Sequence, residues 1–361
     1  MDPDQVDLLK RLTESFGPSG FERETASVVK EEMEGVADSC RVNKLGSVLF
    51  ERRGTSDAPK VLVAAHIDEV GFCVTGIDDT GFLSFTPLGG WFDQVLLGQR
   101  VTVRTRNYDL EGVIAATPPH LLSEEKRKKV VKQEDMYIDI GTSSRKESED
   151  LGVRTGDPVT PKSDLSLIHR GKIAMGKAFD DRIGTFVAME AVKRLKAEKV
   201  SHPNTVIGAA TTQEEIGARG ARTVAHDVEP DVCLVVEADV SGDVPGCSDK
   251  TAPAKMGNGA AILTYDRSMV PNQPLKDFVI SAAEEEKIPH QLSIITKGGT
   301  DAGAIHVSGS GCPSLVIGVP TRHIHSHVGL LSLADVDAVC RLLIACITRL
   351  DRDTVDSFTA L

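Results

Sequence analysis

Acidic and histidine side chains follow directly after several short apolar runs of this 361-residue sequence. The segments in question are His66–Asp68 after KVLVAA, Gln213–Glu215 after TVIGAATT, Glu237–Asp239 after VCLVV and Thr321–His327 after SLVIGVP. A further acidic pair, Asp180 and Asp181, stands just before an apolar stretch. Because ligands of open α/β sheets sit just beyond the carboxyl ends of the strands, we expect all these segments to meet at one rim.

This combination of side chains suits a pair of divalent metal ions. Imidazole and carboxylate groups bind Zn²⁺, Co²⁺ and Mn²⁺, and one carboxylate can bridge two ions about 3.5–4 Å apart that together activate a water molecule. His66 and His325, with three acids, would supply such ligands. Glu214 and Glu215 are adjacent, so one can bind metal while the other acts as the acid–base group. We predict two divalent ions per subunit, Zn²⁺ or Co²⁺ first and Mn²⁺ as an alternative.

Each of these residues also has an ordinary structural explanation. A single histidine at a strand end is more often a hydrogen-bonded structural residue, although Asp68 is placed in the sequence to orient the imidazole of His66. A Glu-Glu pair usually belongs to a solvated surface, but the pair at 214–215 follows an apolar run directly. Asp180 and Asp181 fit an N-cap of the next helix as well as they fit a metal site.

The elements that position these residues alternate between strands and helices. We expect helices at 5–16, 22–35, 182–196, 275–286 and 332–350, and strands at 47–51, 60–65, 205–210, 232–236 and 314–319. This alternation predicts an α/β fold with a mainly parallel sheet flanked by helices. Residues 70–161 are short β-rich segments separated by turns, which indicates an inserted small β-barrel-like domain. The catalytic α/β domain would then comprise residues 1–69 and 162–361.

The composition is that of an acidic globular protein. Its net charge of −12 disfavours nucleic acid and anionic membranes as partners, because both require a basic surface. Seven cysteines without a CxxC pair indicate reduced thiols in a cytoplasmic protein. The N-terminal segment MDPDQVDLLKRL has no signal pattern, and no apolar run approaches the roughly 20 residues of a membrane span. We therefore expect a cytoplasmic protein.

Six motifs along the chain together resemble those of one known family. They are HIDEVG (66–71), KAFDDRIG (177–184), TTQEEIGARG (211–220), EADV (237–240), GGTDAGAI (298–305) and RHIHS (322–326). The set is similar to the M42 metallo-aminopeptidases, the tetrahedral or TET peptidases, of the glutamyl aminopeptidase-like type. The β-rich block resembles the same family at GQRVTV (98–103), TPPHL (117–121), YIDIG (137–141) and LGVRTGD (151–157). The resemblance implies the phosphorylase/hydrolase-like fold of zinc exopeptidases.

The resemblance also implies a role for each site residue. The implied metal ligands are His66, Asp180, Glu215, Asp239 and His325, with Asp180 as the bridge between two ions. Glu214 would be the general base and acid, and Asp68 would orient His66. The implied reaction is hydrolysis of the N-terminal peptide bond of short peptides. The inserted domain would mediate dimer contacts, and dimers would assemble into a hollow tetrahedral dodecamer.

One position departs from the family pattern, and two rival functions remain to be tested. Family members often carry Tyr or another aromatic residue where His323 stands, so the choice of His325 as the ligand rests on the following Ser326. The roles of His323 and His327 are left open, as is the preferred first substrate residue. The first rival is an endoglucanase-type glycoside hydrolase, which needs two carboxyl groups and no metal. The second is a non-catalytic, metal-stabilised assembly protein.

Overall fold

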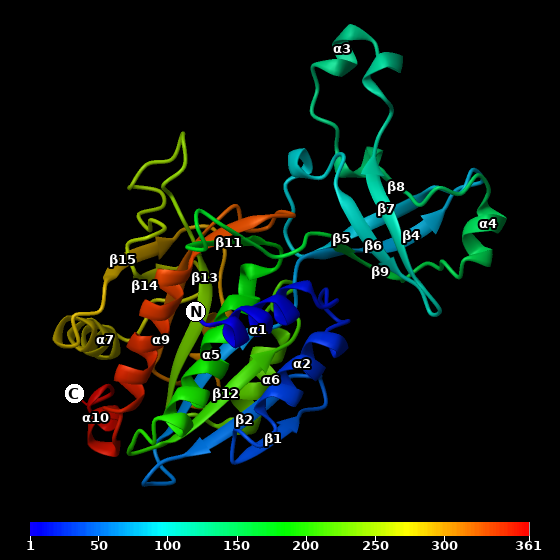
Figure 1. Cartoon of the computed structure of the whole chain (residues 1–361). Helices are drawn as coiled ribbons and strands as arrows, with labels where there is room; N and C mark the ends of the chain where they lie inside the picture. The colour runs from blue at the N-terminus through cyan, green and yellow to red at the C-terminus, as the bar shows by residue number, and fades with distance from the viewer. Residues whose placement is uncertain (361) are drawn as a thin grey trace.

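The computed structural model of the protein describes residues 1–360, which form an α/β part and a small barrel (Figure 1). An eleven-stranded sheet lies at the centre of the α/β part. Its strands are β1 (Ser39–Val42), β2 (Val48–Arg53), β3 (Lys60–His66), β10 (Ser166–Ile168), β11 (Ile173–Gly176), β12 (Thr205–Thr211), β13 (Val232–Val240), β14 (Ala260–Asp266), β15 (His290–Ile295), β16 (Ser314–Arg322) and β17 (Gly329–Ser332). Its helices are α1 (Pro3–Glu14), α2 (Arg23–Met33), α5 (Phe179–Ala197), α6 (Arg219–Val228), α7 (Gln273–Glu285), α8 (Asp301–Ile305), α9 (Leu333–Ile347) and α10 (Arg352–Ser357).

The centre of the sheet is parallel and its edges are antiparallel. β12, β3, β13 and β16 lie side by side in parallel. β2 and β1 extend the sheet beyond β12, and β17, β11 and β10 extend it beyond β16, all by antiparallel pairing. The predicted α/β class is confirmed. Strand–helix alternation does not predict these edges, because short turns join the strands of the edge hairpins.

Alternate residues of the central strands face two different layers of helices. On β3, Val61 and Val63 belong to the larger core, which also contains side chains of α1, α2, α5, α7 and α9. Leu62 and Ala64 belong to the smaller core with α6 and α8. This alternation is the two-residue period of an extended strand. Helix α5 contacts β3, β13, α1 and α9, and these neighbours bury it on nearly all sides.

The barrel is a closed sheet of six antiparallel strands with a core of its own. Its strands are β4 (Gly71–Ile77), β5 (Leu83–Leu88), β6 (Arg100–Arg104), β7 (Asp109–Ala115), β8 (Tyr137–Asp139) and β9 (Pro158–Pro161). Its short helices are η1 (Asp93–Val95), η2 (Pro119–Leu121), α3 (Glu124–Arg127), η3 (Gln133–Asp135) and α4 (Arg145–Asp150). The arm with α3 between β7 and β8 projects away from the rest of the molecule (Figure 1). The domain limits at 69–70 and 161–162 stay predictions.

Within residues 1–360, no helix combines the length and apolar character needed to cross a membrane.

Candidate metal centre and active site

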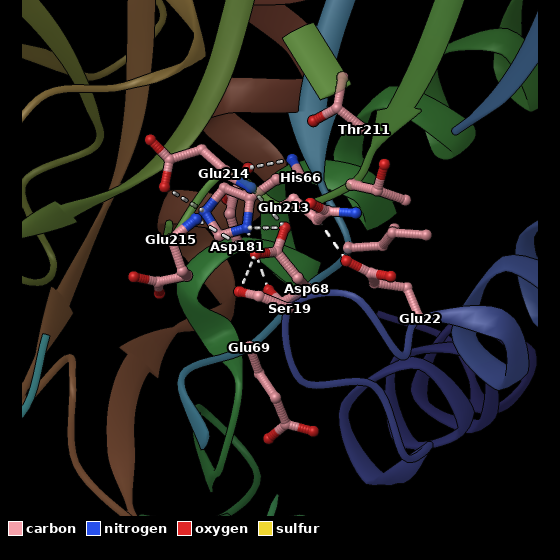
Figure 2. A network of polar contacts seen from close by, with 12 residues as sticks. Ser19, Glu22, His66, Asp68, Glu69, Asp181, Thr211, Gln213, Glu214 and Glu215 are labelled. Atoms are coloured by element: carbon pink, nitrogen blue, oxygen red, sulfur yellow. Dashed lines mark hydrogen bonds and ion pairs between the residues drawn. The ribbon is translucent and has the colours of Figure 1, made fainter. Parts of the chain in front are cut away.

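The parallel register brings the ends of three strands to one level of the sheet. Thr211 of β12 pairs with His66 of β3, and Val235 of β13 pairs with Ala64 of β3. Two residues further along, the same register places Glu237 level with His66. Glu214 and Glu215 follow β12 almost immediately, and Figure 2 shows both beside His66. Side chains that are far apart in the sequence therefore meet at the carboxyl edge of the sheet, as parallel strands require.

Asp180 lies between two histidines. Its Oδ1 is 3.1 Å from Nε2 of His66, and its Oδ2 is 3.1 Å from Nε2 of His325. Oε1 of Glu237 is 3.7 Å from the same nitrogen of His66, and Oε2 of Glu215 is 3.5 Å from that of His325. The residues form two groups, His66–Asp180–Glu237 and Asp180–Glu215–His325, whose donor atoms lie within 4.8 Å of one another in each group. Because the groups share Asp180, its carboxylate is placed to bridge two ions.

Asp239 belongs to neither group, and Glu237 stands in its place. Both acids point to the same side of β13, but Asp239 lies about 7 Å further along the strand than Glu237. There it faces β16, where a Cβ added to Gly318 would lie 2.6 Å from the Cβ of Asp239. Asp239, the ligand that the sequence analysis expects, therefore lies outside both groups, and the choice between it and Glu237 stays a proposal. Both acids follow one apolar run, and only the register against β3 reveals which one is level with His66.

The charges of this cluster are unbalanced without cations. Burial raises the pKa of Glu215 to about 8, and burial also raises the pKa of Glu237 well above its usual range. For Asp180, burial is outweighed by hydrogen bonds from His325 and His66, which hold the pKa of this carboxyl below its usual range. Oε1 of Glu215 is buried and has no hydrogen-bond partner in the described part of the chain. The cluster thus contains two imidazoles and three carboxylates, and it holds more negative charge than its protein neighbours balance. A pair of divalent cations fits this set of groups.

Asp68 connects the two strand ends that carry the cluster. Its backbone oxygen lies 3.0 Å from Nδ1 of His66, and its Oδ1 lies 3.5 Å from the same nitrogen. Its carboxylate accepts the backbone N–H groups of Glu214 at 2.9 Å and Glu215 at 3.1 Å, and the hydroxyl of Ser19 at 2.6 Å. A carbonyl acceptor places the proton of His66 on Nδ1, which leaves Nε2 free to face Asp180.

Glu22 is a buried residue of the site region that the sequence analysis missed. Its Oε1 accepts the backbone N–H groups of Gly20 at 2.7 Å and Gln213 at 3.1 Å (Figure 2). Gln213 has a left-handed φ of 58°, which is costly for a residue other than glycine. Glu22 and Asp68 therefore hold three consecutive N–H groups of the turn that carries Glu214 and Glu215. Only the packing of the segment after α1 against this turn reveals the contact.

In the pair Asp180–Asp181, one residue lies at the candidate metal site and the other caps the following helix. Asp180 faces the two histidines, whereas Asp181 accepts the backbone N–H groups of His66 at 3.2 Å and Gly184 at 3.0 Å. The second contact joins residues three apart, as in a helix N-cap. Asp181 thus anchors both the end of β3 and the first full turn of α5.

The residue after this pair, Arg182, is completely buried and fixes the base of the site. Its guanidinium donates to backbone oxygens of the last turn of α1, of the segment after α1 and of Ile67, and it lies 3.0 Å from the carboxylate of Glu69. Glu69 also pairs with Lys177 at 2.6 Å. Such a buried, fully hydrogen-bonded charge network holds the chain around β3 in one arrangement.

The barrel contributes directly to the site through the segment after β5. The carbonyl oxygen of Gly90 is 2.7 Å from Nδ1 of His325, so Nδ1 carries the proton and Nε2 faces Asp180. A Cβ added to Gly90 would lie 3.1 Å from that Nδ1, and one added to Gly89 would lie 3.1 Å from Oε2 of Glu215. Glycine at both positions permits this close approach of the backbone.

The other two histidines of the loop lie outside both groups. His323 is exposed and has a left-handed φ of 61°. His327 is buried, its ring lies 5.3 Å from that of Trp91, and within residues 1–360 neither of its ring nitrogens has a hydrogen-bond partner. The loop therefore offers His325 alone to the cluster.

A cavity of about 590 Å³ lies over the cluster and contains every member of both groups. Val240, Ile295 and Ile324 form apolar parts of its wall. This volume falls in the range of small-molecule sites.

Comparisons with known proteins agree over nearly the whole chain. The sequence model of the family described as M42 glutamyl aminopeptidase matches residues 46–342. The glutamyl aminopeptidase of Lactococcus lactis subsp. cremoris is 32% identical over 352 residues, which cover 97% of each chain. The crystal structure of a TET aminopeptidase from Thaumarchaeota archaeon SCGC AB-539-E09 is 57% identical, with a TM-score of 0.97 and 99% of each chain covered.

A further similar structure is that of the TET1 peptidase of Pyrococcus horikoshii. It is 34% identical, with a TM-score of 0.86 and coverage of 96% of this chain and 100% of that one. The P. horikoshii protein is described as able to assemble into a tetrahedron or a large octahedral shell.

Proposed function

Because the chain belongs to the M42 peptidase family, we propose that it is a two-metal aminopeptidase that hydrolyses the N-terminal peptide bond of short peptides. The observation that carries this proposal is the position of Asp180, whose carboxylate belongs to both groups of possible ligands. Each group also contains one imidazole. His66, Asp180 and Glu237 would hold one ion, and Asp180, Glu215 and His325 would hold the other. Zn²⁺ or Co²⁺ suits these ligands, with Mn²⁺ as an alternative.

We assign the acid–base role to Glu214, which belongs to neither group. When bound, the two ions would polarise the scissile carbonyl and lower the pKa of the attacking water. Oε2 of Glu214 lies 3.8 Å from Nε2 of His66, beside the cluster. Glu214 accepts the proton of the attacking water and donates it to the leaving amine. Asp68 positions this side chain and His66 through the contacts described above.

The geometry favours this function over a glycoside hydrolase. A glycosidase uses two carboxyl groups with space for the sugar between them and needs no imidazole. Here the carboxylates converge on two imidazoles, an arrangement that suits metal ions. The substrate's free amine would lie among the carboxylates of the cluster, which would restrict cleavage to the first peptide bond.

The experiment that tests the function compares three activities of one preparation. Protein stripped with a chelator and reloaded with Zn²⁺, Co²⁺ or Mn²⁺ is assayed on a panel of aminoacyl-p-nitroanilides, on their N-acetylated forms and on cellulose. We expect metal-dependent cleavage of the free-amine substrates only. Chelator-resistant hydrolysis of cellulose would support the glycosidase instead. Metal-loaded protein that cleaves no substrate would support the assembly protein.

The choice of Glu237 over Asp239 as a ligand has its own test. Glu237→Gln is expected to lower the metal content from two ions to one, because Glu237, and not Asp239, belongs to the group of His66. Asp239→Asn removes a buried charge from the same strand and is the matched control, which should retain two ions. Metal per subunit, measured by elemental analysis after dialysis, distinguishes the two variants. Loss of an ion from Asp239→Asn alone would restore Asp239 as the ligand.

We further propose that subunits associate through the barrel into dimers and then into a tetrahedral dodecamer. The projecting arm carries exposed apolar side chains, among them Leu121 at 77% and Val130 at 50% exposure (Figure 1). Exposed apolar side chains gathered on a projecting element are typical of protein contacts.

All seven cysteines are free thiols. The predicted cytoplasmic location remains a proposal.

A further inference from the structure

A second cavity adjoins the candidate active site. Its volume is about 660 Å³, and it shares Gly90, Ile324 and His325 with the first cavity. One wall comes from the barrel segment 90–99 and the other from the loop 323–328. A ligand that extends past His325 from the cluster therefore enters this second cavity.

The lining of the second cavity is apolar and preformed. Trp91 and Phe92 contribute aromatic rings, and no Asp, Glu, Lys or Arg side chain lines the cavity. The indole of Trp91 donates a hydrogen bond to the backbone oxygen of Gly71 at 3.1 Å and stacks on Phe72 with ring centroids 4.8 Å apart. Phe92 is 59% exposed, so its ring is available for contact. Transfer of an apolar side chain from water into this cavity lowers its free energy. The indole of Trp91 is already fixed, so its ordering adds little entropic cost to binding.

Three histidines, Ser326 and the amide of Gln99 are the polar side chains of this mainly apolar lining. His327 is 3% exposed and neither of its ring nitrogens has a partner among the described residues. His323 and Gln99 also line the cavity. Both ring nitrogens are covered by neighbouring atoms, so a ligand in the cavity gains no hydrogen bond from His327. The other polar side chains of the lining, such as Gln99 and the exposed His323, are those that can contact the backbone of a peptide.

We propose that the second cavity binds the residue that follows the scissile bond and favours an apolar or aromatic side chain there. This inference rests on the proposed function. An aminopeptidase substrate extends beyond the cleaved bond in one direction only, because its free amine is the other end. With the first residue in the first cavity, the next residue passes His325 into the second. A charged side chain there would lose its hydration without meeting an opposite charge.

The test uses the metal-loaded protein and dipeptide amides that differ only in their second residue. The first residue is the one preferred in the p-nitroanilide panel, and the second is Phe, Gly, Asp or Lys. We expect kcat/KM for Phe to exceed that for Gly by at least about tenfold, as for other apolar pockets, and Asp and Lys to fall below Phe. Phe92→Ala should reduce the Phe-to-Gly ratio by at least about threefold, because one apolar group in such a pocket changes kcat/KM by roughly tenfold. Tyr108→Ala is the matched control, because that ring is 58% exposed on the same barrel and does not line the cavity.

Every outcome of this experiment decides something. A Phe-to-Gly ratio near one in the wild-type protein overturns the inference, provided that the p-nitroanilides are cleaved. An unchanged ratio in Phe92→Ala also overturns it, and a changed molecular mass of that variant would then identify the cavity as a contact between subunits. If no aminoacyl substrate is cleaved by metal-loaded wild-type protein, the proposed function itself fails. An equal fall of the ratio in Tyr108→Ala would attribute the effect to the barrel as a whole and contradict a local subsite.

Discussion

Replacing Glu214 by Gln is expected to leave both metal ions bound and to lower kcat by about 10²- to 10⁴-fold, the usual contribution of a general acid–base group. The amide has the size of the carboxylate but cannot accept the proton of the attacking water. Metal content should persist because Glu214 belongs to neither candidate ligand group. The turn should also persist, because Asp68 binds the backbone N–H of residue 214 and not its side chain.

Two measurements on the same sample check this expectation. Elemental analysis gives the ions per subunit, and p-nitroanilide release gives kcat. Glu284→Gln, the same chemical change on the surface helix α7, should keep both values. Near-normal kcat in fully loaded Glu214→Gln would remove this residue from the acid–base role, and loss of an ion would make it a ligand.

Asp180→Asn is expected to abolish binding of both ions and with it all metal-dependent turnover. Asp180 is the one residue common to both groups, and each of its oxygens faces a different imidazole. An amide supplies one neutral oxygen in place of a bridging anion, so neither ion keeps its charge balance. Glu237→Gln should lose one ion only, which separates the bridging position from a terminal one.

Thermal unfolding gives an independent measure of the same prediction. A ligand that binds only the folded state stabilises it by about 2.7 kcal/mol when its concentration is 100 times the dissociation constant. Added Zn²⁺ or Co²⁺ should therefore raise the melting temperature of the stripped wild-type protein and leave that of Asp180→Asn unchanged. A variant that keeps two ions at wild-type affinity would contradict the bridging assignment.

The central part of the fold could be predicted from the sequence because its signals are local. Runs such as KVLVAA are long and apolar enough to indicate buried parallel strands, and β3, β12, β13 and β16 lie where such runs predict them. The sequence analysis did not predict β14 and β15, which lie off the main path of the sheet: β14 pairs with β16, and β15 pairs only with β14. Element α5 begins at Phe179, but Asp180 and Asp181 have non-helical φ and ψ angles, so its continuous helical part begins at the expected residue, Arg182.

Most of the residues that meet at the candidate site could be predicted for a similar reason. His66, Asp180, Glu215 and His325 follow or precede strong apolar elements, so the topology of the sheet alone brings them together. Choosing between two acids on one strand needed the register against β3, which no local pattern contains.

Other parts of the site depend on contacts between segments that are distant in the sequence. Glu22 and Gly90 reach the cluster only because the segment after α1 and the barrel pack against it. Gln213, Ala218, His323 and His325 adopt left-handed φ angles that their residue types disfavour. Such conformations cost about 1–3 kcal/mol each and persist where the surroundings enforce them, so local propensity predicts them poorly.

The hydrogen bond between the carbonyl of Gly90 and His325 means that the α/β part alone does not contain every group that positions the candidate ligands. A shortened chain that joins residues 69 and 162 by a linker would still contain every side chain of the two ligand groups. It would lack the acceptor that selects the tautomer of one imidazole, and it would lack one wall of the second cavity. Any force that tilts the barrel, such as strain between neighbouring copies in an assembly, would therefore be transmitted to that imidazole and alter the affinity of the second ion.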